Sequence, residues 1–158
     1  MLAPLPQGFR AAGTHCGIKK DPENFDLALL VSDFSAASAG VFTQNRVCGA
    51  PVKVSRARTL RTTSRAVILN SGNSNACTGD QGIEDAKWMT ELVAEQLKCA
   101  AEDVFVCSTG VIGRFLPKEK LAAGIPAIVP LLAATPEAFE AASRGILTTD
   151  TRIKQSTR

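Results

Sequence analysis

Apolar residues gather in short runs typical of strands and in longer periodic runs typical of helices. Three short runs, at residues 25–31, 66–69 and 104–106, are almost uninterrupted by polar side chains. Strands that are covered on both faces have such sequences. We therefore expect buried strands there. Further strands are expected in the stretch 8–19, at 40–44 (antiparallel to 25–31) and at 146–151.

Residues 80–98 carry the clearest helical pattern, since their apolar side chains recur at spacings of three and four. The recurring residues are Ala86, Met89, Val93 and Leu97. Proline near the first turn and Thr as an N-cap also mark helix starts. On these grounds helices are expected at residues 50–60, from Pro117 with an interruption around 124–126 and 130, and at 135–144.

Strands and helices alternate along the chain without a linker or an internal repeat. This alternation predicts one α/β domain over residues 1–158. The strand expected at 146–151 reaches the C-terminus without a closing element, so the domain is interpreted as incomplete. An unpaired strand edge of this kind also predicts association with a partner chain.

Composition narrows the functional classes. The net charge is only +3, and the basic residues do not form one block, so we expect no nucleic-acid partner. No apolar run has the roughly 20 residues that a membrane helix needs, and the N-terminus does not have the pattern of a signal peptide.

Five cysteines without CxxC spacing and a single histidine favour neither disulfides nor a metal site. Reduced thiols predict a cytoplasmic protein.

The lone histidine, His15, also argues against a Ser-His-Asp triad, since it lies in an early strand-like segment and no GxSxG elbow is present. A nucleophile serving this protein would have to be activated differently, by its own amine or by a lysine.

Two polar segments follow apolar strands, Asn70–Gly79 and Cys107–Gly113. Strand ends of α/β sheets usually form the ligand crevice. In the second segment, the Thr109 hydroxyl and the Gly110 N–H are suitable donors for an oxyanion. Both segments also have a plainer interpretation, the first as an Asx-rich turn before the helix near Asp80 and the second as an ordinary turn. Neither matches a phosphate-binding loop.

Together, six collinear segments resemble the ornithine acetyltransferase (glutamate N-acetyltransferase) family of arginine biosynthesis. They are GFRAAG at residues 8–13, AGVFTQN at 39–45, APV at 50–52, NSGNSNACTG at 70–79, CSTGVIG at 107–113 and ILTTDT at 146–151.

The resemblance implies a layered α-β-β-α sandwich and a precursor that cleaves itself before a threonine, giving α and β chains. That threonine would take acetyl from N2-acetylornithine and pass it to glutamate through an acetyl-enzyme, and some members also use acetyl-CoA as a substrate. Carried onto this sequence, the oxyanion-hole pair falls on Thr109 and Gly110, and a substrate contact falls on Thr148. An α2β2 assembly is implied, with no metal and no cofactor.

The family's cleavage motif and its nucleophile are expected beyond Thr151, and the sequence as given contains neither. We therefore expect an N-terminal, α-chain portion that is inactive alone. Two other hypotheses remain at this point. One is a non-catalytic small-molecule-binding or interaction domain. The other, an autoprocessing aminopeptidase-like hydrolase, does not account for the NSGNSNACTG segment.

Overall fold

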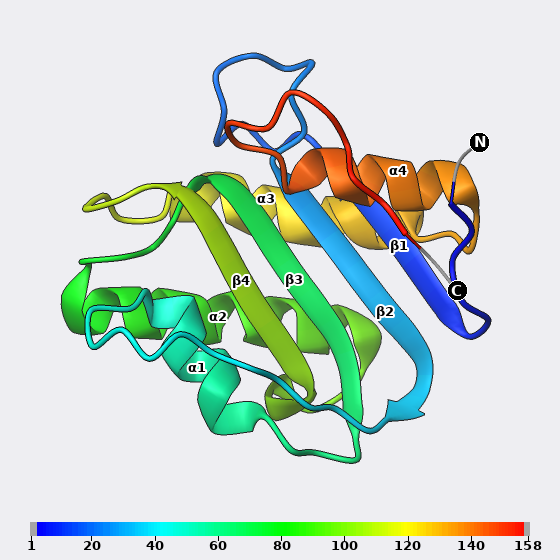
Figure 1. Cartoon of the computed structure of the whole chain (residues 1–158), viewed down its shortest axis with the longest axis horizontal. Helices are drawn as coiled ribbons and strands as arrows, with labels where there is room; N and C mark the ends of the chain where they lie inside the picture. Colours follow the sequence, from blue (N-terminus) through cyan, green and yellow to red (C-terminus); the bar gives the residue numbers. More distant parts are fainter. Residues whose placement is uncertain (1–2, 157–158) are drawn as a thin grey trace.

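The structure is a computed structural model, and it describes residues 3–156. These residues form a four-stranded sheet with helices packed against it (Figure 1). In chain order the elements are β1 (Phe9–Thr14), β2 (Leu27–Ala36), α1 (Ala50–Arg58), β3 (Ser64–Asn73), α2 (Gly79–Leu97), β4 (Val104–Val111), α3 (Lys118–Ile128) and α4 (Pro136–Gly145), with 3-10 turns at Ala101–Asp103 and Val129–Leu131.

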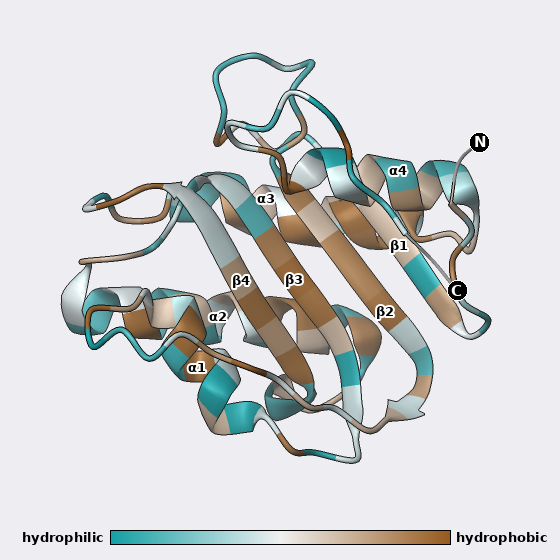
Figure 2. Cartoon of the chain, in the orientation of Figure 1, coloured by the Kyte–Doolittle hydropathy of each residue, from teal (hydrophilic) through white to brown (hydrophobic). Residues whose placement is uncertain are grey.

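The strands lie in the order β1-β2-β3-β4, with antiparallel pairing at the first two interfaces and parallel pairing between β3 and β4. A parallel pair requires a crossover, which α2 supplies, as in other βαβ units. The carboxyl ends of β3 and β4 are consequently neighbours. In Figure 2 both strands lose their brown, hydrophobic colour there, with β3 turning teal and then pale and β4 turning pale.

The main core lies between one sheet face and helices α1, α2 and α3. Alternate strand residues such as Leu29, Ile68 and Val106 point into it and meet Met89 of α2 and Ile125 of α3. All of these side chains are at most 1% exposed. Burial of this aliphatic layer is the main force holding the helices on the sheet.

The opposite sheet face is covered only in part. Ala11 and Ala28 pack against Ala142 of α4, whereas Val67 and Phe105 further along the sheet are half-buried. The α/β class is confirmed. The described residues contribute one β layer of the expected sandwich, together with its helices.

Two expected strands are wrong. Residues 40–44 form no strand. There Phe42 lies under the Arg56 guanidinium at 5.5 Å and the Thr43 carbonyl accepts a hydrogen bond from Arg56, so side chains rather than strand pairing hold this segment. Residues 146–151 form no strand either, because their backbone is a turn at 146 followed by bends and irregular positions. The predicted association through an unpaired strand at 146–151 is therefore not supported, because no strand forms there.

The helix predictions are confirmed in place. Thr135 caps α4 by accepting a hydrogen bond from the Ala138 N–H at 3.2 Å. Helix α3 continues past Pro126 to Ile128, and the interruption occurs only in the 3-10 turn that contains Pro130. Within residues 3–156, every helix is too short or too polar to cross a bilayer.

Candidate functional site at the ends of the parallel strands

The two polar segments lie side by side, and both begin as strand rather than as turn. Parallel pairing continues through Asn70 and Ser108, Ser71 and Thr109, and Gly72 and Gly110. The sequence pattern predicts that these strands end at residues 69 and 106, because the apolar runs end there. Backbone pairing does not depend on side-chain polarity, so the ladder continues into the polar residues.

Gly72 and Gly110 form the closest contact of the site. Both have positive φ, +102° and +132°, a conformation that side chains rarely adopt. A Cβ on Gly110 would lie 2.4 Å from the carbonyl carbon of Gly72 and 2.6 Å from the Asn73 nitrogen. Only glycine fits there. The strand register also shifts at Gly72 and Asn73, which ends regular pairing at this point.

The asparagines beside this contact are structural. The Asn70 amide donates to the Asn73 carbonyl at 2.9 Å and accepts from the Ser108 hydroxyl at 2.6 Å. Asn75 is fully buried, donates to the Gly82 carbonyl and accepts from Thr78. Such buried amides must be satisfied internally. The Asx-rich interpretation is therefore the better one for these side chains, which hold the loop between β3 and α2.

The two predicted oxyanion donors differ from these residues in exposure. Thr109 and Gly110 are both exposed, whereas Asn70 and Ser71 are buried. Thr109 pairs with Ser71 in the register, so its side chain lies on the same sheet face as the Ser71 hydroxyl. That hydroxyl donates to the Gly145 carbonyl at the end of α4. The structure therefore brings Thr109 and Gly110 together at an accessible strand end that α4 approaches.

Thr148, the third predicted residue, lies in an open cavity just past α4. Charged groups of both signs line this cavity. Its lining residues are Lys19, Glu23, Asn24, Phe25, Arg144, Leu147, Thr148, Asp150 and Thr151. Arg144 stacks on the Phe25 ring at 4.3 Å and donates to the Glu23 carbonyl, which fixes one wall. Acidic and basic groups in one cavity suit a zwitterionic ligand.

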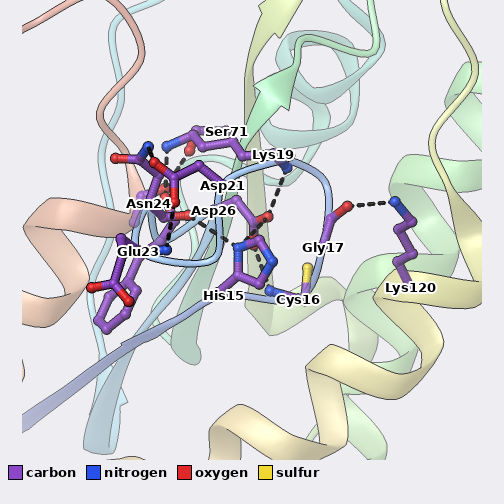
Figure 3. A network of polar contacts seen from close by, with 12 residues as sticks. His15, Cys16, Gly17, Lys19, Asp21, Glu23, Asn24, Asp26, Ser71 and Lys120 are labelled. Atoms are coloured by element: carbon purple, nitrogen blue, oxygen red, sulfur yellow. Dashed lines mark hydrogen bonds and ion pairs between the residues drawn. The ribbon is translucent and has the colours of Figure 1, made fainter.

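A network of hydrogen bonds around Asp26 connects the loop after β1 to the end of β3 (Figure 3). Asp26 is fully buried and accepts backbone hydrogen bonds from Cys16 at 2.7 Å and Lys19 at 2.9 Å. Its own carbonyl accepts from the Ser71 N–H at 2.9 Å. His15 lies 3.3 Å from the Asp26 carboxylate and 3.1 Å from the Asn24 carbonyl. His15 thus helps to fix a loop.

Residues important to the site but missing from the sequence prediction are Lys19, Asp26 and Gly72. Asp26 left a signal, because it is the one charged residue in the apolar run at 25–31. A fully buried carboxylate must have partners. Gly72 could also have been identified, since each polar segment contains a glycine at a strand end. Nothing in the sequence pattern distinguishes Lys19 from the other lysines. Burial lowers the pKa of its ammonium, and the Asp26 charge opposes that effect.

Cys16 is expected to be an unreactive thiol. Burial, reinforced by the Asp26 charge, raises its pKa to about 12. Thiolate is the reactive form, so at pH 8 iodoacetamide should label Cys16 roughly a thousandfold more slowly in the folded chain than in urea. Exposed Cys77 serves as the control, with similar rates in both states. Mass spectrometry of quenched samples measures both, and equal rates for Cys16 would contradict the prediction.

Among the described residues 3–156, no three His, Cys, Asp or Glu side chains come together in a way that could hold a metal ion.

Known proteins resemble the chain over almost its whole length. A sequence profile described as the ArgJ family matches residues 10–158. The arginine biosynthesis bifunctional protein ArgJ of Geobacter sulfurreducens is 50% identical over 153 residues, covering 96% of this chain and 38% of the relative. The ArgJ protein of Bacillus subtilis is 45% identical, covering 96% and 36%. The chain thus spans less than two fifths of these curated relatives.

Two solved structures are similar to this chain over more than nine tenths of its length. The arginine biosynthesis bifunctional protein ArgJ of Bacillus halodurans gives a TM-score of 0.87 at 41% identity, covering 92% of this chain and 75% of that one. Ornithine acetyltransferase from Mycobacterium tuberculosis, solved in complex with ornithine, gives a TM-score of 0.89 at 42% identity, covering 93% and 79%. On the family profile and these relatives, the chain belongs to the ArgJ family.

Proposed function

We propose that this chain is the N-terminal portion of an acetyltransferase that moves acetyl from N2-acetylornithine to glutamate. The observation that carries the proposal is the accessible Thr109–Gly110 strand end, locked against Gly72, in a fold that is similar to an ornithine acetyltransferase. The names of the curated relatives support the same pathway. That the tuberculosis enzyme was solved with ornithine supports an ornithine derivative as the acyl donor.

In this mechanism a threonine outside the given sequence attacks the acetyl carbonyl of N2-acetylornithine. The carbonyl oxygen becomes negative, and the Thr109 hydroxyl and Gly110 N–H donate to it. Preorganised donors of this kind stabilise a tetrahedral intermediate more than they stabilise the substrate. The proton lost by the threonine hydroxyl passes to the amide nitrogen as the C–N bond breaks, so ornithine leaves and an acetyl ester remains on the threonine. The glutamate amine then attacks this ester, its proton returns to the threonine oxygen as the ester C–O bond breaks, and N-acetylglutamate is released.

Thr148 is proposed to contact the substrate, and the charged cavity around it suits an amino acid. No cofactor is proposed. Acetyl-CoA would be a second acetyl donor, an idea supported by the word bifunctional in the relatives' names.

The catalytic unit is proposed to need a second chain. The chain covers 38% of a curated relative but 75–79% of the solved chains. The solved chains are thus considerably shorter than the curated relatives, which supports processing of a precursor into an α and a β chain. An α2β2 assembly is proposed, with residues 1–158 as a single α/β domain of the α chain.

The test uses the complete gene product that contains this chain, called here the complete protein, and the chain alone. With N2-acetylornithine and glutamate, the complete protein should form equal amounts of ornithine and N-acetylglutamate, and the chain alone should form neither. If the complete protein forms neither product while the chain alone binds ornithine in isothermal titration, a non-catalytic binding domain is the better function.

A further inference from the structure

We propose that Lys19 is a positioning residue that fixes the substrate-binding segment at Thr148 against the glycine pair beside Thr109. The inference rests on the proposed acetyl transfer, because that function gives Thr148 and Thr109 their roles. It adds a residue that lies far from both in sequence and that carries no role in the mechanism above.

The Lys19 ammonium holds the residue next to Thr148. Its Nζ donates to the Leu147 carbonyl at 2.6 Å and to the Phe25 carbonyl at 2.6 Å. Both acceptors are neutral backbone carbonyls, so these two hydrogen bonds leave the positive charge of the ammonium unneutralised. An ammonium has three donors, which leaves one N–H for the cavity that Lys19 and Thr148 both line.

The other end of Lys19 is fixed to the sheet. Its backbone N–H donates to the Asp26 carboxylate at 2.9 Å, and the Asp26 carbonyl accepts from the Ser71 N–H at the end of β3 (Figure 3). Asp26 is fully buried, and the Cys16 N–H shares its carboxylate. The loop carrying Lys19 is therefore anchored at the strand position that pairs with Thr109.

The stem of Lys19 also lies against the glycine contact. Its Cγ is 3.3 Å from where a Cβ on Gly72 would be, and the Ile18 Cγ2 is 2.9 Å from that point. Gly72 in turn pairs with Gly110. The Lys19 side chain thus contacts β3 beside the Gly72–Gly110 pair with its stem and the Leu147 carbonyl, next to Thr148, with its ammonium.

Other contacts hold this region on either side of Thr148. Beyond Thr148, the Gln155 side-chain amide donates to the Ser143 hydroxyl of α4 at 2.7 Å. The Ser71 hydroxyl donates to the Gly145 carbonyl at 2.6 Å, two residues before Leu147. The lysine acts where the chain leaves the helix and enters bends. Without it, the bends at 148–149 and 151–152 would be held less tightly to β3 and β4. A displaced Thr148 would contact the substrate less well, which raises KM.

The experiment is a double-mutant cycle in the complete protein with Lys19→Met and Thr148→Ala. Methionine keeps most of the stem and removes the donors. We expect Lys19→Met to raise the KM for N2-acetylornithine about tenfold, with a smaller change in kcat. In the Thr148→Ala background the same substitution should change KM less than threefold, because its effect acts through Thr148. Lys20→Met, at an exposed neighbouring lysine, should change neither constant.

Additive effects of Lys19→Met and Thr148→Ala on KM would overturn the inference, as would an effect of Lys20→Met equal to that of Lys19→Met. If Lys19→Met fails to fold, the same cycle is run with Lys19→Gln, which keeps amide donors on a shorter stem, and the same additivity criterion applies. A complete wild-type protein that transfers no acetyl refutes the proposed function instead. Transfer with an additive cycle refutes only the role of Lys19.

Discussion

Gly110→Ala is expected to lower the free energy of unfolding of this chain by about 3 kcal/mol or more. Two costs add up. The backbone at Gly110 has φ of +132°, and a new Cβ would overlap the Gly72 backbone at 2.4 Å. A flexible side chain could move aside, but paired strand backbone cannot move without breaking the parallel ladder. Urea denaturation followed by Trp88 fluorescence measures the loss, because Trp88 is the only tryptophan.

Gly113→Ala is the matched control for this prediction. Gly113 also has positive φ, +77°, but no atom lies within 4 Å of a Cβ built on it. It should therefore show only the cost of the left-handed conformation, about 1–2 kcal/mol. Equal losses at the two glycines would mean that the close contact between β3 and β4 is not present in solution.

Thr109→Ala in the complete protein is expected to lower kcat by about 10²–10³-fold, the usual effect of removing one oxyanion donor. The KM for N2-acetylornithine should change less than about threefold, because the hydroxyl acts on the charge that forms only during reaction. Thr109 is exposed, so the melting temperature should be nearly unchanged. Steady-state kinetics over a range of donor concentrations separates the two constants.

Thr109→Ser controls for the loss of the side chain as such. Serine keeps the hydroxyl and should retain kcat within about tenfold of the wild type. If Thr109→Ala instead raises KM and leaves kcat intact, Thr109 binds the ground state and is not an oxyanion donor.

The sequence predicts those parts of the fold that depend on local pattern. It predicts helix α2 because the apolar side chains of this segment recur on one face, and it predicts β2 because residues 25–31 are almost wholly apolar. The same reasoning failed at Val41, which is 100% exposed. An apolar β-branched residue favours a strand only where a neighbouring strand is available to pair with it.

The site could be predicted in outline only. Thr109 and Gly110 were identified through a family resemblance, and their pairing with Ser71 and Gly72 follows from β3 and β4 being adjacent and parallel. The contact from Lys19 to Leu147 joins residues 128 positions apart. Hydrophobic periodicity carries no information about such a contact, because it depends on where a loop and a helix end meet after folding.

Acetyl-enzyme formation is tested most directly by mixing the complete protein with N2-acetylornithine in the absence of glutamate. The account predicts a rapid burst of ornithine of about one equivalent per site, followed by turnover only when glutamate is added. The Thr109→Ala variant should give a burst of the same size at a rate lower by about 10²-fold or more. A protein that releases no ornithine until glutamate is present, yet transfers acetyl when it is, would contradict the account.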